Sequence, residues 1–193
     1  MIRCEYIFPT PVWSFNFECD QDKMIEYINE LMDIDPGREV SNSGGWQSND
    51  IDVDNTPQDV KNLVKFVEKN VPLFMSEYGY SSKELYLDNL WFNVNPKGGF
   101  NKPHVHGGCF LSGVYYIKTK KDCGDIVFSR EGQDSYIIFH NVENPNGRCG
   151  HTDWRYVPED NMCVIFPSWL SHRVEINNTD SDRISLAFNL SWK

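Results

Sequence analysis

From Leu85 onward, the spacing of apolar residues changes from the helical period to the period of two that is typical of β-strands. Turn-forming runs of Asn, Pro and Gly separate these segments. Strands are predicted over residues 85–95, 110–117, 125–129, 135–140, 154–157, 162–167, 172–177 and 183–192. So many short strands in one stretch predict a mainly β fold, either a sandwich or a jelly-roll barrel.

Two segments before this region have helical spacing instead. Residues 20–33 place apolar side chains at helical intervals behind an acidic start. A second helix should begin at Thr56-Pro57, where a capping hydroxyl precedes a proline at the first helical position. Pro72 should kink or split this helix, and Gly79 should end it. We expect both helices to pack on one sheet.

The remaining N-terminal segments predict little regular structure. Residues 4–17 are apolar but contain two prolines, which indicates an edge strand broken by proline. Residues 36–55 are polar and rich in glycine, which indicates a loop. With 193 residues the chain is expected to be a single domain spanning 1–193, with a helical support region at about 20–80 and a barrel at about 85–192.

Charge and cysteine content exclude several classes of protein. The formal net charge of −10 argues against binding to nucleic acid or to an anionic membrane surface. The six cysteines include no C-x-x-C pair, so a structural zinc ribbon is not expected. Scattered cysteines and an N-terminus without signal-peptide character predict reduced thiols in a cytoplasmic protein.

Several predicted strands have one polar face. In residues 183–192 the apolar face opposes a face of Arg183, Ser185, Ala187, Asn189 and Ser191. Such a face lies in solvent in many antiparallel sheets. Alternatively, the apolar faces pack on the helices and the polar faces line a binding cavity, which suits Trp91 and Tyr116 better than open solvent.

The histidines favour the cavity. His104 and His106 are two residues apart, so their side chains point the same way on a strand. Together with His172 they predict three imidazoles that converge on one metal ion, since imidazole is a good ligand for iron, zinc, copper and nickel. His140 and His151 are expected to be structural or surface residues.

Arg183 is the candidate for binding an anionic ligand. If segments 172–177 and 183–192 are antiparallel neighbours, Arg183 enters the same cavity as His172. Its guanidinium could then bind a carboxylate, with the Ser185 hydroxyl alongside. The alternative is a surface arginine paired with one of the aspartates just before it in the sequence.

Taken together, these motifs resemble those of the Fe(II)- and 2-oxoglutarate-dependent dioxygenases, whose fold is the double-stranded β-helix. The chain is most similar to a small family of such oxygenases found in marine bacteria and phages. The resemblance rests on matching stretches at residues 7–12, 44–48, 101–106 and 111–116, and on a last stretch that runs from 166–170 through to 188–189. It therefore covers nearly the whole chain.

The resemblance implies a role for each site residue. Fe(II) would be held by His104, His106 and His172, and the far carboxylate of 2-oxoglutarate by Arg183 and Ser185, while Asn93, Asn95 and Tyr116 occupy positions that contact the co-substrate in related enzymes. It further implies that O2 and 2-oxoglutarate are consumed, with succinate as a product, to hydroxylate a substrate. The expected substrate is a peptide or small molecule, with an amino-acid or prolyl side chain as the first expectation.

One departure from the common pattern leaves alternatives open. Most such oxygenases bind iron through two histidines and a carboxylate, and here His106 takes the place of the carboxylate. Either three histidines bind the metal, only two do, or a distant acid such as Asp125 completes the set. A cupin, a zinc hydrolase using Glu131 or Asp125, and a non-catalytic jelly roll are the rival classes. A cupin normally has a glutamate soon after the histidine pair, whereas residues 107–118 contain no acid.

Two loops are candidates for a lid over the substrate. One surrounds Trp46 and the other spans Arg130 to Asp134. The first strand, at residues 4–17, could pair across a dimer.

Overall fold

The computed structural model describes residues 2–80, 85–130 and 151–192. Its helices are α1 (Gln21–Ile34) and α2 (Gln58–Ser76), with a 3₁₀ turn at Val53–Asn55. The strands are β1 (Trp13–Asn16), β2 (Asn42–Ser43), β3 (Trp46–Gln47), β4 (Leu85–Asn95), β5 (Phe100–His104), β6 (Leu111–Lys118), β7 (Ile126–Ser129), β8 (Asp153–Tyr156), β9 (Met162–Pro167), β10 (His172–Val174) and β11 (Arg183–Trp192).

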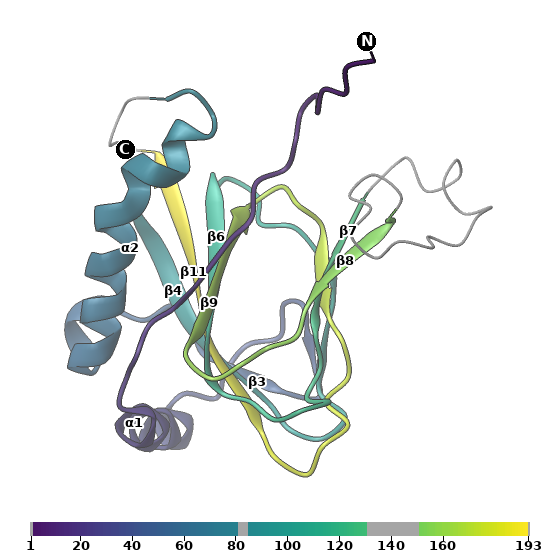
Figure 1. The fold of residues 1–193 in the computed structure, drawn as a ribbon. Helices are drawn as coiled ribbons and strands as arrows, with labels where there is room; N and C mark the ends of the chain where they lie inside the picture. Colours follow the sequence, from purple (N-terminus) through teal and green to yellow (C-terminus); the bar gives the residue numbers. More distant parts are fainter. Residues whose placement is uncertain (1, 81–84, 131–150, 193) are drawn as a thin grey trace.

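These strands form two antiparallel sheets that face each other (Figure 1). The larger sheet has the order β1-β9-β6-β11-β4-β3, and the smaller has the order β2-β5-β10-β7-β8. Both helices lie against the outer face of the larger sheet. The fold is thus mainly β with two helices on one sheet, as the sequence predicts, and its two sheets do not form one continuous barrel.

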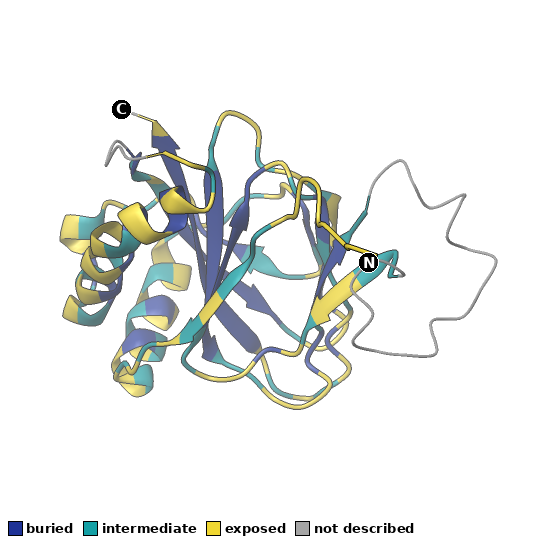
Figure 2. Ribbon diagram, turned by 45° about the horizontal axis from the view of Figure 1, so that its top comes forward, coloured by how far each residue is buried: buried dark blue, intermediate teal, exposed yellow. Residues whose placement is uncertain are grey.

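Each helix buries one apolar stripe against the larger sheet. Together these stripes form the main hydrophobic core, which lies between the helices and the outer face of that sheet. In α1, Met24 and Ile28 are fully buried, and the Asp20 side chain caps the first turn by accepting from the Lys23 backbone N–H. In α2, the buried stripe is Val60, Leu63, Val67, Val71, Phe74 and Met75. These side chains pack on the apolar residues of β4 and β11, among them Phe92 and Phe188. The exposed faces of both helices point outward (Figure 2).

A second, smaller core lies between the two sheets. It joins Val114, Tyr116, Val164 and Phe166 of the larger sheet to Ile126 and Phe128 of the smaller one. The polar face of β11 turns toward this space and is buried, with Arg183, Ser185 and Asn189 at most 5% exposed. The polar face of β11 therefore does not lie in solvent, because a solvated face would leave these side chains exposed.

Most predicted elements are present. The strands at 85–95, 162–167 and 183–192 have the predicted bounds, and β1 is a short edge strand of the larger sheet. Gly79, with φ +75°, closes α2 through a hydrogen bond from the Tyr80 N–H to the Met75 carbonyl. The predicted strand at 135–140 lies outside the described residues.

Three local expectations are wrong. Residues 36–55 are not simply a loop, because they contain β2, β3 and the 3₁₀ turn. Thr56 does not cap α2: its hydroxyl donates to the Val53 carbonyl and closes the 3₁₀ turn. Pro72 does not split α2, which continues to Ser76, because buried side chains on both sides of the proline hold the helix on the sheet.

The prediction of which strands lie beside Arg183 is also wrong, although the expected burial of its side chain is confirmed. β10 lies in the smaller sheet between β5 and β7, whereas β11 lies in the larger sheet between β4 and β6. Segments 172–177 and 183–192 are therefore not hydrogen-bonded neighbours. Arg183 and His172 reach the same inter-sheet space from opposite sheets.

Among the described helices, none is long and apolar enough to cross a membrane. The described cysteines are all unpaired thiols: Cys4, Cys19, Cys109, Cys123 and Cys163. Cys149 lies outside the described residues.

Gly124 is a position where a side chain should not fit. Its φ is +99°, and an added Cβ would lie 2.2 Å from the Glu175 carbonyl oxygen. We expect Gly124→Ala to lower the free energy of unfolding by about 2–4 kcal/mol, because strain at positive φ adds to a clash with fixed backbone. Urea unfolding measures this loss.

Gly98→Ala is the matched control. Gly98 has φ +84° but open space around an added Cβ, so only the conformational cost of about 1 kcal/mol should remain. Equal losses in the two variants would contradict the role assigned to the close approach at Gly124.

Candidate metal centre

Three histidines come together between the sheets. His104 ends β5, His172 begins β10, and the two face each other across neighbouring strands. One ring nitrogen from each of His104, His106 and His172 lies within 4.8 Å of the others. The ring centroids are 4.3 Å apart for His104 and His172, and 5.2 Å for each pair that includes His106. This is the convergence that the sequence predicts.

The route by which His106 reaches the site differs from the prediction. His106 lies two residues beyond the end of β5, so the alternation of one strand does not align it with His104. Its backbone N–H donates to the Ser168 carbonyl at 2.9 Å, which fixes the turn next to the segment leading to His172. The loop after β5, rather than the strand, brings His106 to the other two rings.

The same ring nitrogen, Nδ1, faces a hydrogen-bonding oxygen in all three histidines, and the Ser41 hydroxyl lies near the other nitrogen of His104. Each Nδ1 faces an oxygen: the Lys102 carbonyl at 2.7 Å for His104, the Leu170 carbonyl at 2.9 Å for His172, and Asn189 Oδ1 at 2.8 Å for His106. An Nδ1–H that donates to an oxygen leaves the lone pair on Nε2. Such second partners are typical of metal-binding histidines, so this donor set fits a transition-metal ion.

Aromatic side chains pack against two of the three rings, and His172 is the most buried of the three. Trp91 of β4 stacks on His106 with centroids 5.7 Å apart, and Phe166 of β9 packs edge-on to His172 at 4.7 Å. Burial lowers the pKa of all three imidazoles, to about 4 for His106 and about 3 for His172. The rings are therefore neutral near pH 7, the form in which imidazole binds metals.

This burial predicts how the stability of the metal-free protein depends on pH. The unfolded chain takes up protons on these histidines near pH 6.5, but the folded chain does so only near the lowered pKa values. The contribution of these histidines to stability should be complete above pH 6.5. It should fall below that pH by up to about 1.4 kcal/mol per pH unit for each histidine, down to about pH 4 for His106 and about pH 3 for His172.

Urea midpoints measured with a chelator at pH 7.5 and 5.5 test this. His172→Leu should flatten the dependence, because one of the groups is removed. Equal midpoints at the two pH values in the parent protein would contradict it.

A second group of polar residues lies on three adjacent strands of the larger sheet. Arg183 is opposite Asn95, and Ser185 is opposite both Asn93 and Tyr116. All five side chains are buried, from 0% exposed for Tyr116 to 7% for Asn93. The structure thus brings together every residue that the sequence analysis assigned to the co-substrate.

Some of these buried polar atoms have no protein partner. Among the described residues, no group accepts a hydrogen bond from Arg183 Nε or Nη2, and none pairs with the Tyr116 hydroxyl. The guanidinium lies 5.0 Å from the Tyr116 ring centroid. Burial raises the pKa of Tyr116 to about 12, which keeps its hydroxyl a donor. Because unpaired buried donors are costly, this set fits an anionic ligand such as a carboxylate.

Sequence reasoning missed the residues that support the site. Asn189 accepts from both His106 and the Ser112 hydroxyl, at 2.8 and 2.7 Å. On the other side, Asn101 donates to the Ser41 hydroxyl, which lies 3.4 Å from His104 Nε2. Asn189 stood on the predicted polar face, but Ser41 lies in the segment predicted as a loop, and no local pattern indicated that it would reach the metal centre.

Trp46 is not placed as a lid. It lies on β3 opposite Val94, its ring packs on the core beneath the helices, and its indole N–H donates to the Asp35 carbonyl at 3.0 Å. That core is on the other side of the sheet from the histidines, so the interpretation of Trp46 as a substrate lid is wrong. Of the second candidate loop, residues 131–134 lie outside the described part of the chain.

The other acids and histidines do not join the three rings. Asp125 lies near Arg155, at 3.7 Å, and is not part of the described metal-ligand cluster. His151 contacts the edge of Trp154, with ring centroids 5.5 Å apart. His140 and Glu131 lie outside the described residues. Within the described ranges, the cluster consists of three histidines and no carboxylate.

Comparison with known proteins agrees with this geometry. Residues 89–189, which include all three histidines and the buried arginine, match the model of a family described as "Putative 2OG-Fe(II) oxygenase". The match covers more than half of the chain, and the protein belongs to this family. It is an oxidoreductase that depends on Fe(II) and 2-oxoglutarate. No curated protein has a sequence similar enough to count as a match.

Solved structures share the fold, the double-stranded β-helix. A prolyl-4-hydroxylase of Pseudomonas putida is 13% identical, with a TM-score of 0.66 over 95% of this chain and 94% of that one. The 2-oxoglutarate-dependent epimerase SnoN of nogalamycin biosynthesis is 13% identical, with a TM-score of 0.61 over 94% and 78% of the two chains. HygX from Streptomyces hygroscopicus, solved with nickel and 2-oxoglutarate, is 11% identical, with a TM-score of 0.59 over 95% and 84%.

Proposed function

We propose that His104, His106 and His172 bind Fe(II) through their Nε2 atoms. The observation that carries the proposal is that each Nδ1 is already hydrogen-bonded to an oxygen while the three rings converge. A set of neutral ligands leaves the bound ion with one more positive charge than two histidines and a carboxylate would. It should therefore favour anionic co-ligands such as a keto acid.

Arg183, Ser185 and Tyr116 bind the far carboxylate of 2-oxoglutarate in this proposal. The guanidinium supplies two unpaired donors and Tyr116 a third, all within a buried region. Asn93 and Asn95, directly across the strand pair, form the adjoining wall. An anion bound there satisfies donors that otherwise remain buried without partners.

Bound Fe(II) and 2-oxoglutarate supply, with O2, the oxidative decarboxylation of the keto acid to succinate and CO2, coupled to hydroxylation of a substrate. The protein contributes the positions of the ligands and aromatic side chains packed beside them. Trp91 and Phe166 cover the rings of His106 and His172. Arg183 orients the co-substrate from the opposite end, and its charge balances the carboxylate.

The substrate class we propose is an amino-acid or peptide side chain. Val105, between two of the histidines, is 48% exposed, and Trp169, three residues before His172, is 61% exposed. These apolar side chains offer a surface beside the centre on which a peptide could rest. The Pseudomonas putida prolyl-4-hydroxylase and a Trichoplax adhaerens prolyl hydroxylase solved with a peptide fragment share the fold.

Anaerobic titration of the metal-stripped protein with Fe(II) and then 2-oxoglutarate tests the site. A weak visible charge-transfer band should appear only when both are present. Metal binding without any response to 2-oxoglutarate would contradict the co-substrate site, and no metal binding would contradict the histidine centre. Succinate formation with candidate peptides, measured against a blank without peptide, then tests the substrate class.

A further inference from the structure

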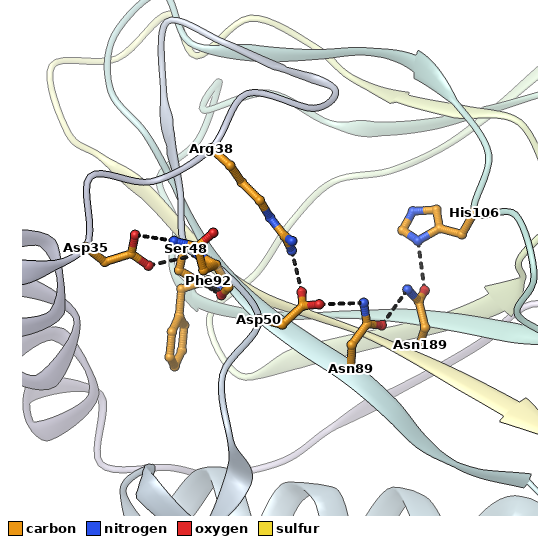
Figure 3. Close-up of polar contacts among 9 residues, drawn as sticks. Asp35, Arg38, Ser48, Asp50, Asn89, Phe92, His106 and Asn189 are labelled. Atoms are coloured by element: carbon orange, nitrogen blue, oxygen red, sulfur yellow. Dashed lines mark hydrogen bonds and ion pairs between the residues drawn. The ribbon is translucent and has the colours of Figure 1, made fainter.

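A chain of hydrogen bonds runs from His106 to an acid near the surface (Figure 3). His106 Nδ1 lies 2.8 Å from Asn189 Oδ1, and Asn189 Nδ2 donates to Asn89 Oδ1 at 2.8 Å. Asn89 Nδ2 in turn reaches Asp50 Oδ2 at 3.5 Å, the longest contact of the chain. Asp50 also forms an ion pair with Arg38. We call these four residues, His106, Asn189, Asn89 and Asp50, the relay.

His106 differs from the other two histidines in the kind of acceptor that it faces. The Nδ1 atoms of His104 and His172 face backbone carbonyls, which can only accept. The acceptor for His106 is a side-chain amide, which can present either its oxygen or its NH2 group. If the amide of Asn189 turned over, Nδ1 would have to accept, the proton would move to Nε2, and Nε2 could no longer bind a metal.

The direction of the Asn189 amide is set further along the relay. Ser112, its other neighbour, has a hydroxyl that can donate or accept and therefore does not select a direction. Asn89 does select a direction for the Asn189 amide, as long as the side-chain oxygen of Asn89, rather than its NH2 group, faces Asn189. The Asp50 carboxylate keeps Asn89 in this orientation, because a carboxylate only accepts hydrogen bonds. If the Asn89 amide turned over, its oxygen would face the carboxylate oxygen, which is unfavourable.

The backbone holds the two asparagines in line. Asn189 of β11 is directly opposite Asn89 of β4, and the register shifts immediately afterwards, since Leu190 is opposite Leu87. This irregularity leaves Asp88 as an extra residue on β4, as in a β-bulge. Such bulges redirect side chains, and this one lies where the relay crosses between strands.

Asp50 acts as an acceptor more than as a charge. Its side chain is 49% exposed and it is paired with Arg38, so solvent and the guanidinium screen its field at the metal centre. The directional effect survives this screening, because it depends only on which atoms can donate. Substitutions can therefore separate the effect of the Asp50 charge from the effect of its carboxylate as a hydrogen-bond acceptor.

We propose that Asp50 is a positioning residue that, through Asn89 and Asn189, holds His106 in the Nδ1–H tautomer and so presents Nε2 to the metal. This inference rests on the proposed role of His106 as a ligand. It assigns a function to a residue of the segment before α2, remote in sequence from every histidine. It also explains why the two side-chain amides linked in series, those of Asn189 and Asn89, are buried and half-buried beside the three histidines.

The test compares Asp50→Asn with Arg38→Met. Asp50→Asn keeps the shape but can donate as well as accept, so the relay loses its direction. In the metal-free protein at pH 7.5, ¹⁵N NMR of the histidine rings should show His106 purely as Nδ1–H in the parent and as a mixture of tautomers in Asp50→Asn. Fe(II) affinity should fall about 3- to 10-fold, less than the 10- to 100-fold typical of a direct second partner.

Arg38→Met is the matched control, because it removes the ion pair with Asp50 and the guanidinium over the Trp91 ring but leaves the carboxylate as acceptor. It should leave the His106 tautomer and the Fe(II) affinity unchanged. The proposal is overturned if Asp50→Asn keeps pure Nδ1–H, or if Arg38→Met shifts the tautomer as far as Asp50→Asn does. Amide NMR spectra establish that both variants are folded.

Failure of the metal site itself would look different. The tautomer is read without metal, so a shift in Asp50→Asn together with no Fe(II) binding by the parent would reject the proposed ligand role of His106 and with it this inference. Asn189→Asp gives a further check, because a carboxylate at this position accepts from Nδ1 without the relay. In the double variant with Asp50→Asn, it should restore the Nδ1–H tautomer, and a persistent mixture would count against the proposal.

Discussion

Arg183→Met should weaken 2-oxoglutarate binding by at least about 100-fold while changing the stability of the metal-free protein by no more than about 1 kcal/mol. The loss in binding follows from removing a charged donor from a buried carboxylate, which costs about 3 kcal/mol or more. Stability should be nearly unchanged because Nε and Nη2 of the buried guanidinium have no partner among the described residues. Removing this penalty offsets the lost contact with the Tyr116 ring.

Anaerobic titration with 2-oxoglutarate, in the presence of Fe(II), and urea unfolding measure the two quantities. Arg173→Met is the control, since Arg173 lies on β10, is partly exposed and pairs with Asp153 at 2.9 Å. It should leave co-substrate binding unchanged. A large loss of stability in Arg183→Met, with co-substrate affinity retained, would show that the arginine is a structural residue.

His172→Ala should abolish the stabilisation of the protein by Fe(II). At a metal concentration of about 100 times Kd, binding should stabilise the parent by about 2.7 kcal/mol. For a chain of this size that corresponds to a rise in Tm of roughly 5–10 °C. Removal of one of three ligands should reduce the rise to within error, because the remaining two imidazoles no longer enclose the ion.

Thermal unfolding under argon, with and without Fe(II), measures this effect. His151→Ala is the matched control, because His151 contacts Trp154 and is not part of the cluster. Its rise in Tm should equal that of the parent. If His172→Ala keeps the full rise, iron is bound elsewhere on the protein.

The three-histidine cluster distinguishes this chain from oxygenases that use two histidines and a carboxylate. In the described part of the chain, Asp125 is held near Arg155 rather than at the cluster. In the proposed site His106 takes the place of the carboxylate, and it is also the one of the three rings whose Nδ1 faces a side-chain amide. His106 thus has a longer network of side-chain partners than His104 and His172, which have backbone carbonyls as partners.

The strands at 85–95 and 183–192 could be predicted because apolar and polar side chains alternate along much of them, and the strand at 162–167 because it is a short continuous apolar run. β5 was missed because its sequence, Phe-Asn-Lys-Pro-His, contains a proline and no alternation. It forms a strand through pairing with β10 on one side and β2 on the other. Such pairing partners are distant in sequence and leave no local signal.

The chemistry of the candidate site could be read from the sequence alone: three imidazoles, an arginine and the polar face on which Ser185 and Asn189 lie. Side-chain type and the period of a strand are local properties, so they can be read from the chain. The tertiary structure was needed to show that Arg183 and His172 approach from opposite sheets, that Trp46 lies on the far side of the larger sheet, and that hydrogen bonds link Asp50 to His106 through Asn89 and Asn189. These relations depend on how the two sheets pack and on the register of their strands, which are set by contacts across the whole fold.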